Sequence, residues 1–424
     1  MKLKQLMDDF ITLAIQSGGW MELDRLYLRN KLLMMIGGHT PDSDYEAVYD
    51  STSADSLADS LVAYAVEMGY SNEQSSKSYL KSQLLDLLAP PPSVVNAFFA
   101  QHYSKSSEEA TNYFYELNKR NHYIYTPQVG KKEHYETPYG EFVIQTLEDE
   151  KAGKSRAIDG FSTANLTEYP KCTYCFENEG YGEEGSAALP TRRLIRMNVG
   201  GESWGFQFSD WEEYKEKFFI SSEAHRGLMK NKDSIARIAQ LLDIFPQYFI
   251  LLSPEKAKEH SYYEGGRESF PIAAAAVRTY IELKEFPLMN VGSLDWPFPV
   301  IRLQSPNVED IIEGSDYILQ KWQQCYGEKL SVEPMIIGRK KKNLYEIDLL
   351  LTSGKQPNEE RATAEYLGRH SLSPVNGKKS IVENQLSEKV LEEYVAMLKS
   401  WTPFGMDQQI GENEAIDDFL HRLE

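Results

Sequence analysis

Cysteine and histidine residues are the clearest candidates for chemistry in this sequence. Cys172 and Cys175 are separated by two residues in YPKCTYCFENEGYG, a spacing that lets two thiolates bind one tetrahedral metal ion. A complete site needs two more ligands, and His225 in SSEAHRG and His260 in KEHSYY are candidates because both lie near predicted strand ends. Two buried or solvated thiols are the alternative, since a single Cys-x-x-Cys pair is a weak signal.

A glycine pair followed by an arginine is the second candidate. In EHSYYEGGRESF, Gly265 and Gly266 could bring backbone amides, and Arg267 a guanidinium, to a phosphate. A turn followed by a solvated arginine is the alternative. The sequence lacks the patterns G-x-x-x-x-G-K-[ST], G-x-G-x-x-G after a strand, and H-E-x-x-H, which would indicate other phosphate or zinc enzymes.

Two kinds of secondary structure must position these residues. The N-terminal part carries apolar side chains at helical spacing, as in the stripe of Leu3, Leu6, Met7, Phe10 and Leu13. From Tyr123 onward, short β-branched and aromatic runs such as EFVIQTL, SWGFQFS and QYFILLS alternate with helical segments such as DSIARIAQLLDIF. This alternation predicts an α+β fold with a largely antiparallel sheet.

The chain is predicted to form three parts. Residues 1–125 form a helical N-terminal domain, and residues 126–352 form the α+β domain that contains the cysteine pair. Residues 353–424 form a polar C-terminal tail with one or two helices, one of them LSEKVLEEYVAMLKSW. The segment LEDEKAGKSRA is predicted to be a solvated linker.

The acidic composition restricts the partners and the compartment. The net charge of −19 argues against nucleic acid or an anionic membrane, because their phosphates would be repelled. No apolar run approaches the roughly 20 residues of a membrane helix, and the N-terminus lacks the features of a signal peptide. Three cysteines, two of them in one pair, fit a reducing compartment, so a cytoplasmic location is predicted.

Many stretches in order resemble the class II hexose-1-phosphate uridylyltransferases, the galactose-1-phosphate uridylyltransferases of the Firmicutes type. The N-terminal stretches are MELDRLYLRNKLL, LLDLLAPPPSVVNAFF and SSEEATNYFYELNKRNHYI. The central stretches are YPKCTYCFENEGY, RRLIRMNVGGESWGFQFS, FPQYF, YYEGGRESFPIAAAA and DWPFPVIRL. The similarity is collinear over about residues 20–350, which makes it far more specific than any single motif.

The resemblance implies a fold and an activity. The family fold is related to the histidine-triad nucleotide-binding proteins, with an antiparallel sheet flanked by helices. In these enzymes a histidine attacks the α-phosphate of UDP-glucose, and hexose 1-phosphate then takes the uridylyl group from that histidine. The chemistry needs a neutral imidazole in line and donors to the phosphoryl oxygens.

The resemblance also implies a zinc ion held by two cysteines and two histidines. Cys172 and Cys175 match the cysteine pair of the family, and His225 matches the histidine of its Ser-Glu-x-His element. His260 matches the first histidine of the H-x-H-x-Q motif. All four ligand types are therefore retained, and the implied role of the zinc is structural.

The catalytic motif departs from the family pattern. His-Asp-His-Tyr-Gln-Gly-Gly-Arg-His aligns with residues 260–268, so that Tyr262 stands at the position of the nucleophilic histidine. Glu264 replaces the glutamine that bridges the phosphate. Arg267 is retained, and its guanidinium could donate hydrogen bonds to a phosphate. A phenol has a reference pKa near 10 and supplies little nucleophile at neutral pH. Ordinary uridylylation of galactose 1-phosphate is therefore expected to be lost.

Further departures cluster around the same motif. Glu268 replaces the last histidine of the pattern, and Lys215-Glu216-Lys217 stands where the family has Asn-Glu-His. Of the C-terminal histidine-rich segments, only an isolated His370 is left. An active enzyme that uses Tyr262 or His260 as the nucleophile is the alternative.

Nucleotide binding is a separate prediction. RRLIRMN and SWGFQFS resemble the segments that face the base and ribose in the family. The candidate binding residues are Arg193, Arg196, Asn198, Phe206, Gln207, Gly265 and Gly266. The alternative is that the phenylalanines are ordinary strand residues and the arginines are solvated.

Three hypotheses of different classes follow. The first is a nucleotidyltransferase or phosphohydrolase with altered catalytic groups. The second is a pseudoenzyme that binds a nucleotide, a nucleotide sugar or a sugar phosphate. The third is a structural or assembly protein that uses the sheet to form a homodimer. The altered motif favours the second and third over ordinary uridylyl transfer.

Overall fold

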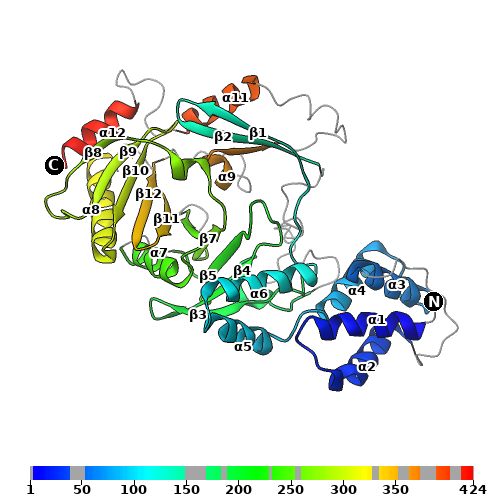
Figure 1. Ribbon diagram of the computed structural model, residues 1–424. Coiled ribbons are helices and arrows are strands. Elements are labelled where there is room, and N and C mark those ends of the chain that lie inside the picture. The colour runs from blue at the N-terminus through cyan, green and yellow to red at the C-terminus, as the bar shows by residue number, and fades with distance from the viewer. Residues whose placement is uncertain are drawn as a thin grey trace. The chain divides into compact units, whose positions relative to one another are not determined.

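The computed structural model describes residues 3–38, 53–148, 169–182, 189–228, 232–253, 259–326, 334–351, 362–372, 388–401 and 412–423 (Figure 1). The chain divides into two compact units. Unit 1 comprises residues 1–125, 155–197 and 204–211, and unit 2 comprises residues 126–154, 198–203 and 212–424. The division falls within β3 (Ile195–Val199) and β4 (Glu202–Phe208). The predicted boundaries at residues 125 and 352 stay predictions.

Unit 1 begins with a group of helices around one apolar core. They are α1 (Leu3–Gln16), η1 (Glu22–Asp24), α2 (Arg25–Ile36), α3 (Ala54–Glu67) and α4 (Gln74–Asp86). The predicted stripe of α1 is confirmed, because Leu3, Leu6, Met7 and Phe10 are buried and Leu13 packs against the core at its edge. Burial of one apolar face is what stabilises helices of this length in water.

Two further helices of unit 1 follow a run of prolines. Pro90, Pro91 and Pro92 lie between α4 and α5 (Pro92–Tyr103), and Pro92 takes the first helical position, where no N–H is needed. The helix α6 (Ser107–Arg120) begins at Ser106, whose hydroxyl accepts a hydrogen bond from the Glu109 N–H at 3.0 Å. This contact confirms the predicted N-terminal cap.

Unit 2 contains two sheets. The smaller sheet is the hairpin of β1 (Val129–Thr137) and β2 (Gly140–Leu147), to which β13 (Arg369–Leu372) adds in parallel. The larger sheet has, within this unit, the strand order β5-β7-β6-β11-β12-β10-β9-β8, and every pair in that series is antiparallel. The strands are β5 (Phe218–Ser222), β6 (Phe249–Leu252), β7 (Tyr262–Gly266), β8 (Val277–Ile281), β9 (Asn290–Leu294), β10 (Val300–Ser305), β11 (Met335–Lys341) and β12 (Leu344–Leu350).

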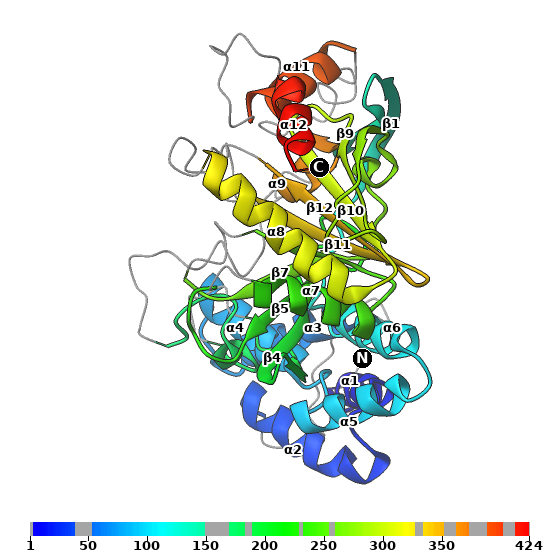
Figure 2. The same ribbon diagram turned by 90° about the vertical axis from the view of Figure 1, so that its left-hand side faces the viewer.

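Both faces of the larger sheet are covered. The helices α7 (Lys232–Ile244) and α8 (Val308–Tyr326) pack side by side against β6, β10, β11 and β12 on one face (Figure 2). On the other face, the core includes side chains of η3 (Pro271–Ala274), α9 (Ala362–Tyr366) and α11 (Glu388–Ser400). The helix α12 (Glu412–His421) contacts β8 and β9. The predicted α+β class with an antiparallel sheet is therefore confirmed, and so is the predicted C-terminal helix over Glu388–Ser400, while residues 386–387 lie outside the described residues.

The described helices do not provide a membrane span. None of those that the structure describes combines the length and the apolar character that crossing a bilayer requires. The predicted relation of the fold to the histidine-triad proteins stays a prediction.

Candidate functional site

His260 lies two residues before β7 in a conformation suited to metal binding. Its ring is buried, and its Nε2 lies 2.7 Å from the Ser222 carbonyl oxygen. Because a carbonyl can only accept, Nε2 must donate, and the lone pair of the neutral ring then sits on Nδ1. Metal-bound histidines are held by this kind of hydrogen bond. The His225 ring lies next to it, with 4.7 Å between the ring centroids.

Cys172 and Cys175 form a tight turn before η2 (Phe176–Asn178). The Cys175 N–H donates to the Cys172 carbonyl at 3.2 Å, and the Asn178 side-chain amide donates to both cysteine carbonyls. The two sulfur atoms lie 3.5 Å apart. The hydrogen bond with Cys175 and burial both raise the pKa of the Cys172 thiol.

The four predicted ligands come together as one cluster. One ligand atom from each of Cys172, Cys175, His225 and His260 can be chosen so that all lie within 4.8 Å of one another. Two sulfur and two imidazole nitrogen donors are a set that tetrahedral sites use. The residues therefore fit a metal ion, and the cluster could hold one.

The strand β7 places Tyr262 on one face of the larger sheet. Its ring is buried and meets the Phe219 ring edge-on, with centroids 5.8 Å apart. Ser221 of β5 lies opposite Tyr262 in the register of the two strands. Ser221 is fully buried, and its hydroxyl has no hydrogen-bond partner among the residues that the structure describes.

Glu264 lies on the same face as Tyr262, two residues along the strand, and its carboxylate is held by other side chains of unit 2. The Tyr214 hydroxyl donates to Oε1 at 2.5 Å, and Lys217 Nζ lies 3.4 Å from the same atom. The Thr363 hydroxyl donates to Oε2 at 3.3 Å. Burial and the charge of Glu264 raise the pKa of Tyr214 well above its ordinary value, so this phenol remains a donor.

The glycine pair of β7 is required by packing. A Cβ added at Gly265 would lie 2.3 Å from the Phe218 ring and 2.4 Å from the Phe249 carbonyl oxygen. A Cβ at Gly266 would lie 2.6 Å from the Tyr214 ring. These contacts leave no room for a side chain at either residue, so close packing accounts for both glycines whether or not a phosphate binds here.

Arg267 ends the motif in an ion pair. Its Nε lies 3.2 Å from Glu216 Oε2, and its guanidinium lies over the Tyr248 ring. The Tyr248 hydroxyl donates to the same carboxylate at 2.5 Å. The Arg267 side chain is about one-fifth exposed, so the guanidinium is largely withdrawn from solvent.

Charges around β7 balance without a surplus of cations. Lys217 also pairs with Glu213 at 2.8 Å, and Arg369 pairs with Glu268 at 3.3 Å. The three paired cations are Lys217, Arg267 and Arg369, and the four carboxylates that they contact are Glu213, Glu216, Glu264 and Glu268. A phosphate placed beside these groups would meet no excess positive charge from them.

The predicted nucleotide-binding arginines have protein partners. Arg193 is buried and donates to the carbonyls of Pro90, Pro190, Arg192 and Ala89 and to the carboxylate of Asp86. Arg196 is nearly half exposed, pairs with Glu179 and lies over the Phe176 ring. Arg193 therefore helps to hold unit 1 together, whereas Arg196 can still reach solvent.

The other nucleotide-binding candidates occupy different surroundings. Asn198 accepts a hydrogen bond from the Gly201 N–H within the turn between β3 and β4. Phe206 is fully buried and packs against Phe114 and Phe208. Gln207 is also buried, and its amide nitrogen has no hydrogen-bond partner among the described residues. The roles predicted for these residues stay predictions.

Sequence reasoning missed the side chains that neutralise the motif. Lys217 stood out only as a departure from the family pattern, and Tyr214, Thr363 and Arg369 carried no signal. Thr363 and Arg369 lie about a hundred residues beyond β7 in the chain, so only the fold brings them to the strand.

The fold and the site together define an α+β protein with a Cys/His cluster beside a strand that carries a Gly-Gly-Arg motif. The family profile described as "Galactose-1-phosphate uridyl transferase, N-terminal domain" matches residues 20–225. The galactose-1-phosphate uridylyltransferase of Staphylococcus saprophyticus is 33% identical over 82% of this chain and 75% of its own length. That of Enterococcus faecalis is 30% identical over 82% and 74%. The chain belongs to the galactose-1-phosphate uridylyltransferase family.

A solved structure shows a weaker likeness. The crystal structure of yeast Ap4A phosphorylase Apa2 in complex with AMP matches with a TM-score of 0.44 and 10% identity, over 71% of this chain and 98% of that one. A likeness at this level is too weak to support a comparison of the two folds.

Proposed function

We propose that this chain is a divergent hexose-1-phosphate uridylyltransferase homologue that binds a nucleotide or nucleotide-sugar ligand and has lost ordinary uridylylation of galactose 1-phosphate. The observation that carries the proposal is the surroundings of two side chains of β7, Tyr262 and Glu264. The phenol of Tyr262, which the sequence resemblance aligns with the nucleophile of the family, is buried, and the carboxylate of Glu264 is paired with Lys217 beside it.

The physical argument concerns charge and protonation. Uridylyl transfer needs a strong nucleophile, such as a neutral imidazole or a phenolate, and donors that stabilise the phosphoryl oxygens. Tyrosine provides a neutral hydroxyl at pH 7, and the cations around β7 already contact four carboxylates. Neither requirement is met by the protein groups on this strand.

A buried amide supports the binding half of the proposal. The Gln207 amide nitrogen has no hydrogen-bond partner among the described residues, and leaving a buried donor unmet costs about 1–3 kcal/mol. A ligand carbonyl, such as that of a nucleobase, would satisfy this donor. Arg196, which still reaches solvent, is the second proposed ligand contact.

We further propose that the metal in the cluster is zinc, held by Cys172, Cys175, His225 and His260, with a structural role. Zinc in such a site stabilises the fold and supplies no reactive group. This role would leave His260 unavailable as a nucleophile, because Nε2 donates to the Ser222 carbonyl and Nδ1 would be the atom that binds the metal.

The test is a coupled assay with UDP-glucose and galactose 1-phosphate. We expect no turnover above background for the natural chain, and measurable turnover for the double variant Tyr262→His/Glu264→Gln. Tyr262→Phe is the matched control and stays inactive. Robust turnover by the natural chain would refute the proposal.

A second measurement separates the remaining alternatives. Intact-mass analysis after incubation with UDP-glucose detects a uridylyl adduct, which Tyr262→Phe would abolish if the phenol oxygen attacked the α-phosphorus, lost its proton and released glucose 1-phosphate. We expect no adduct, but a thermal shift with a uridine nucleotide that is lost in Gln207→Leu. Absence of both adduct and shift would leave the structural or assembly role.

A further inference from the structure

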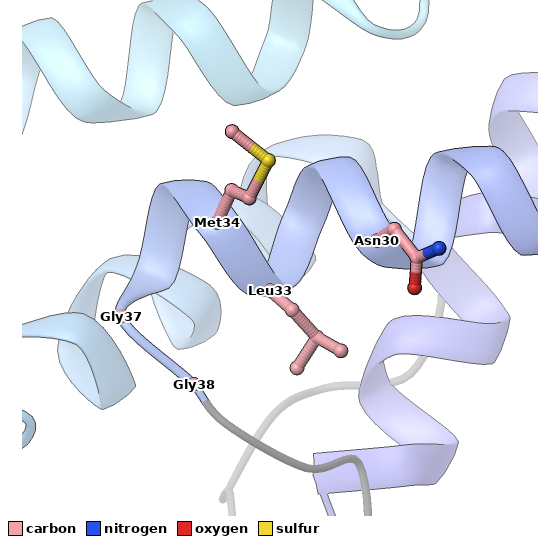
Figure 3. Close-up of a pocket in the computed structure, with 5 residues that line it drawn as sticks. All are labelled: Asn30, Leu33, Met34, Gly37 and Gly38. Carbon is pink, nitrogen blue, oxygen red and sulfur yellow. The ribbon is translucent and has the colours of Figure 1, made fainter.

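Two features of unit 1 are not used by the proposed function, a pocket and a buried arginine. The pocket lies at the C-terminal end of α2 and has a volume of about 450 Å³ (Figure 3). It is lined by Asn30, Leu33, Met34, Gly37 and Gly38. Asn30 is the only polar side chain in this lining, so the pocket offers no charged group to a ligand. The arginine is Arg192, which contacts the Cys-x-x-Cys turn directly.

Arg192 is a buried cation without a carboxylate partner. The residue is 4% exposed. Among the described residues no carboxylate pairs with it, whereas the neighbouring Arg193 pairs with Asp86 at 2.8 Å. Burying a charge is costly unless other polar contacts replace the counter-ion. The role of Arg192 must therefore lie in the groups that its guanidinium contacts.

The guanidinium joins the segment after α6 to the cysteine turn. Its Nε donates to the Tyr123 hydroxyl at 3.1 Å, and its central carbon lies 5.8 Å from the centre of the Tyr123 ring. Its Nη1 donates to the Thr173 carbonyl at 2.6 Å. Tyr123 is itself fixed, because its N–H donates to the Asn118 carbonyl and to the Asn121 side-chain oxygen, both at 3.0 Å. One rigid planar group therefore ties Thr173 to a buried anchor.

The Thr173 carbonyl belongs to the same peptide group as the Tyr174 N–H. In a planar trans peptide the C=O and N–H point in opposite directions, so holding the carbonyl also fixes the direction of the N–H. The hydrogen bond with Cys175 and burial raise the pKa of the Cys172 thiol, and the backbone N–H groups of Tyr174 and Cys175 act in the opposite direction. An N–H that donates to the sulfur stabilises the thiolate, which is the form that binds a metal.

Other contacts hold the two ends of the turn. The Asn178 amide donates to the Cys172 carbonyl at 2.7 Å and to the Cys175 carbonyl at 3.1 Å, and Asn178 is buried. These bonds leave out the central peptide between Thr173 and Tyr174, where Arg192 supplies the contact. All of these residues lie in unit 1. Asn178 and Arg192 thus fix different peptide groups of the same turn.

We propose that Arg192 is a positioning residue of the Cys/His cluster, and that it orients the peptide between Thr173 and Tyr174 so that the cysteine turn is ready to bind a metal ion. The inference rests on the metal site proposed above and adds to it a residue that supplies no ligand atom. Residues that orient metal ligands in this way contribute about 10- to 100-fold to metal affinity.

The test compares metal binding by variants of the full chain. We expect Arg192→Met to weaken zinc binding at least about tenfold, measured by competition with a chromophoric chelator. With cobalt(II) in place of zinc, the same variant should shift the thiolate-to-cobalt charge-transfer absorption, because the N–H contact with the sulfur changes. Tyr123→Phe removes only the hydroxyl that Nε contacts and should weaken zinc binding by a smaller factor. Leu32→Ala, in the apolar core of unit 1, is the control, which lowers stability but leaves the zinc affinity and the cobalt absorption unchanged.

Unchanged zinc affinity and cobalt absorption in Arg192→Met would overturn the inference. An equal loss of zinc affinity in Leu32→Ala would also overturn it, because the effect would then follow from stability. Far-UV circular dichroism shows whether Arg192→Met folds, and if it does not, an unchanged zinc affinity in Tyr123→Phe overturns the inference. A natural chain that binds neither zinc nor cobalt refutes the proposed metal site and this inference with it, whereas metal binding that is independent of Arg192 refutes the inference only.

Discussion

The Cys/His cluster and β7 are two residues apart in the chain, at His260 and Tyr262, but their polar groups are balanced in different ways. In β7 the protein itself supplies the partners, because Lys217 and Tyr214 hold Glu264, and Glu216 holds Arg267. In the cluster, two thiols and two imidazoles converge within 4.8 Å, and the two sulfur atoms would bind a metal ion as thiolates. One region could therefore hold a metal ion, whereas the polar groups of the other are balanced by internal ion pairs.

The largest expected loss of stability follows from removing one side chain of the Cys/His cluster. Cys175→Ser removes one of four metal donors and is expected to lower both the bound zinc per chain and the free energy of unfolding, the latter by about 4 kcal/mol or more. Metal analysis and chemical denaturation measure the two quantities. Cys325→Ser, at an exposed cysteine of α8, is the control and should change neither. Unchanged stability in Cys175→Ser would mean that the cluster, like β7, needs no bound metal ion.

The second effect concerns the ion pairs at β7. Lys217→Met leaves the carboxylates of Glu213 and Glu264 without their shared cation, which we expect to cost about 3 kcal/mol. Lys215→Met alters an exposed neighbour and should stay within about 0.5 kcal/mol. Urea unfolding of both variants provides the comparison. Equal stabilities of the two variants would show that the ion pairs of Lys217 contribute little to the free energy of unfolding.

The third effect separates packing from phosphate binding at the glycine pair. Gly265→Ala places a Cβ against the Phe249 carbonyl oxygen, which belongs to the neighbouring strand and cannot move far. We expect a loss of about 2 kcal/mol in the absence of any ligand. Thermal unfolding without nucleotide measures it, and a stable variant would argue that the glycines are there for a ligand.

The smallest effect on stability is expected at Arg196. Its ion pair with Glu179 is nearly half exposed on the arginine side, so Arg196→Ala should change the free energy of unfolding by less than about 1 kcal/mol. The same variant should reduce the thermal shift produced by a uridine nucleotide. A full thermal shift in Arg196→Ala would remove this residue from the proposed ligand contacts.

The sequence predicted the elements with strong periodicity and missed those that depend on their neighbours. The α1 stripe, the cap at Ser106, the strands β2 and β6 and the helix α11 were all indicated by local patterns. The strand β7 was not, because Glu264, Gly265 and Gly266 have low strand propensity and are held in the sheet by β5 and β6 on either side.

The candidate site was predictable to the same extent. Four ligand types at matching positions located the cluster, since cysteine and histidine have few other reasons to converge. Glu264 was recognised as a departure from the glutamine of the family, but its contacts with Lys217 and Tyr214 could not be foreseen, because their approach depends on how residues 214–217 turn into β5.

All five residues of β7 are buried, and this has a consequence for the history of the protein. A strand with no solvent-facing position can exchange one ring for another of similar bulk, but it cannot lose a ring without opening a void. Under the proposal that Tyr262 has replaced a histidine, the exchange of rings would let a lineage abandon a reaction while its architecture survived unchanged.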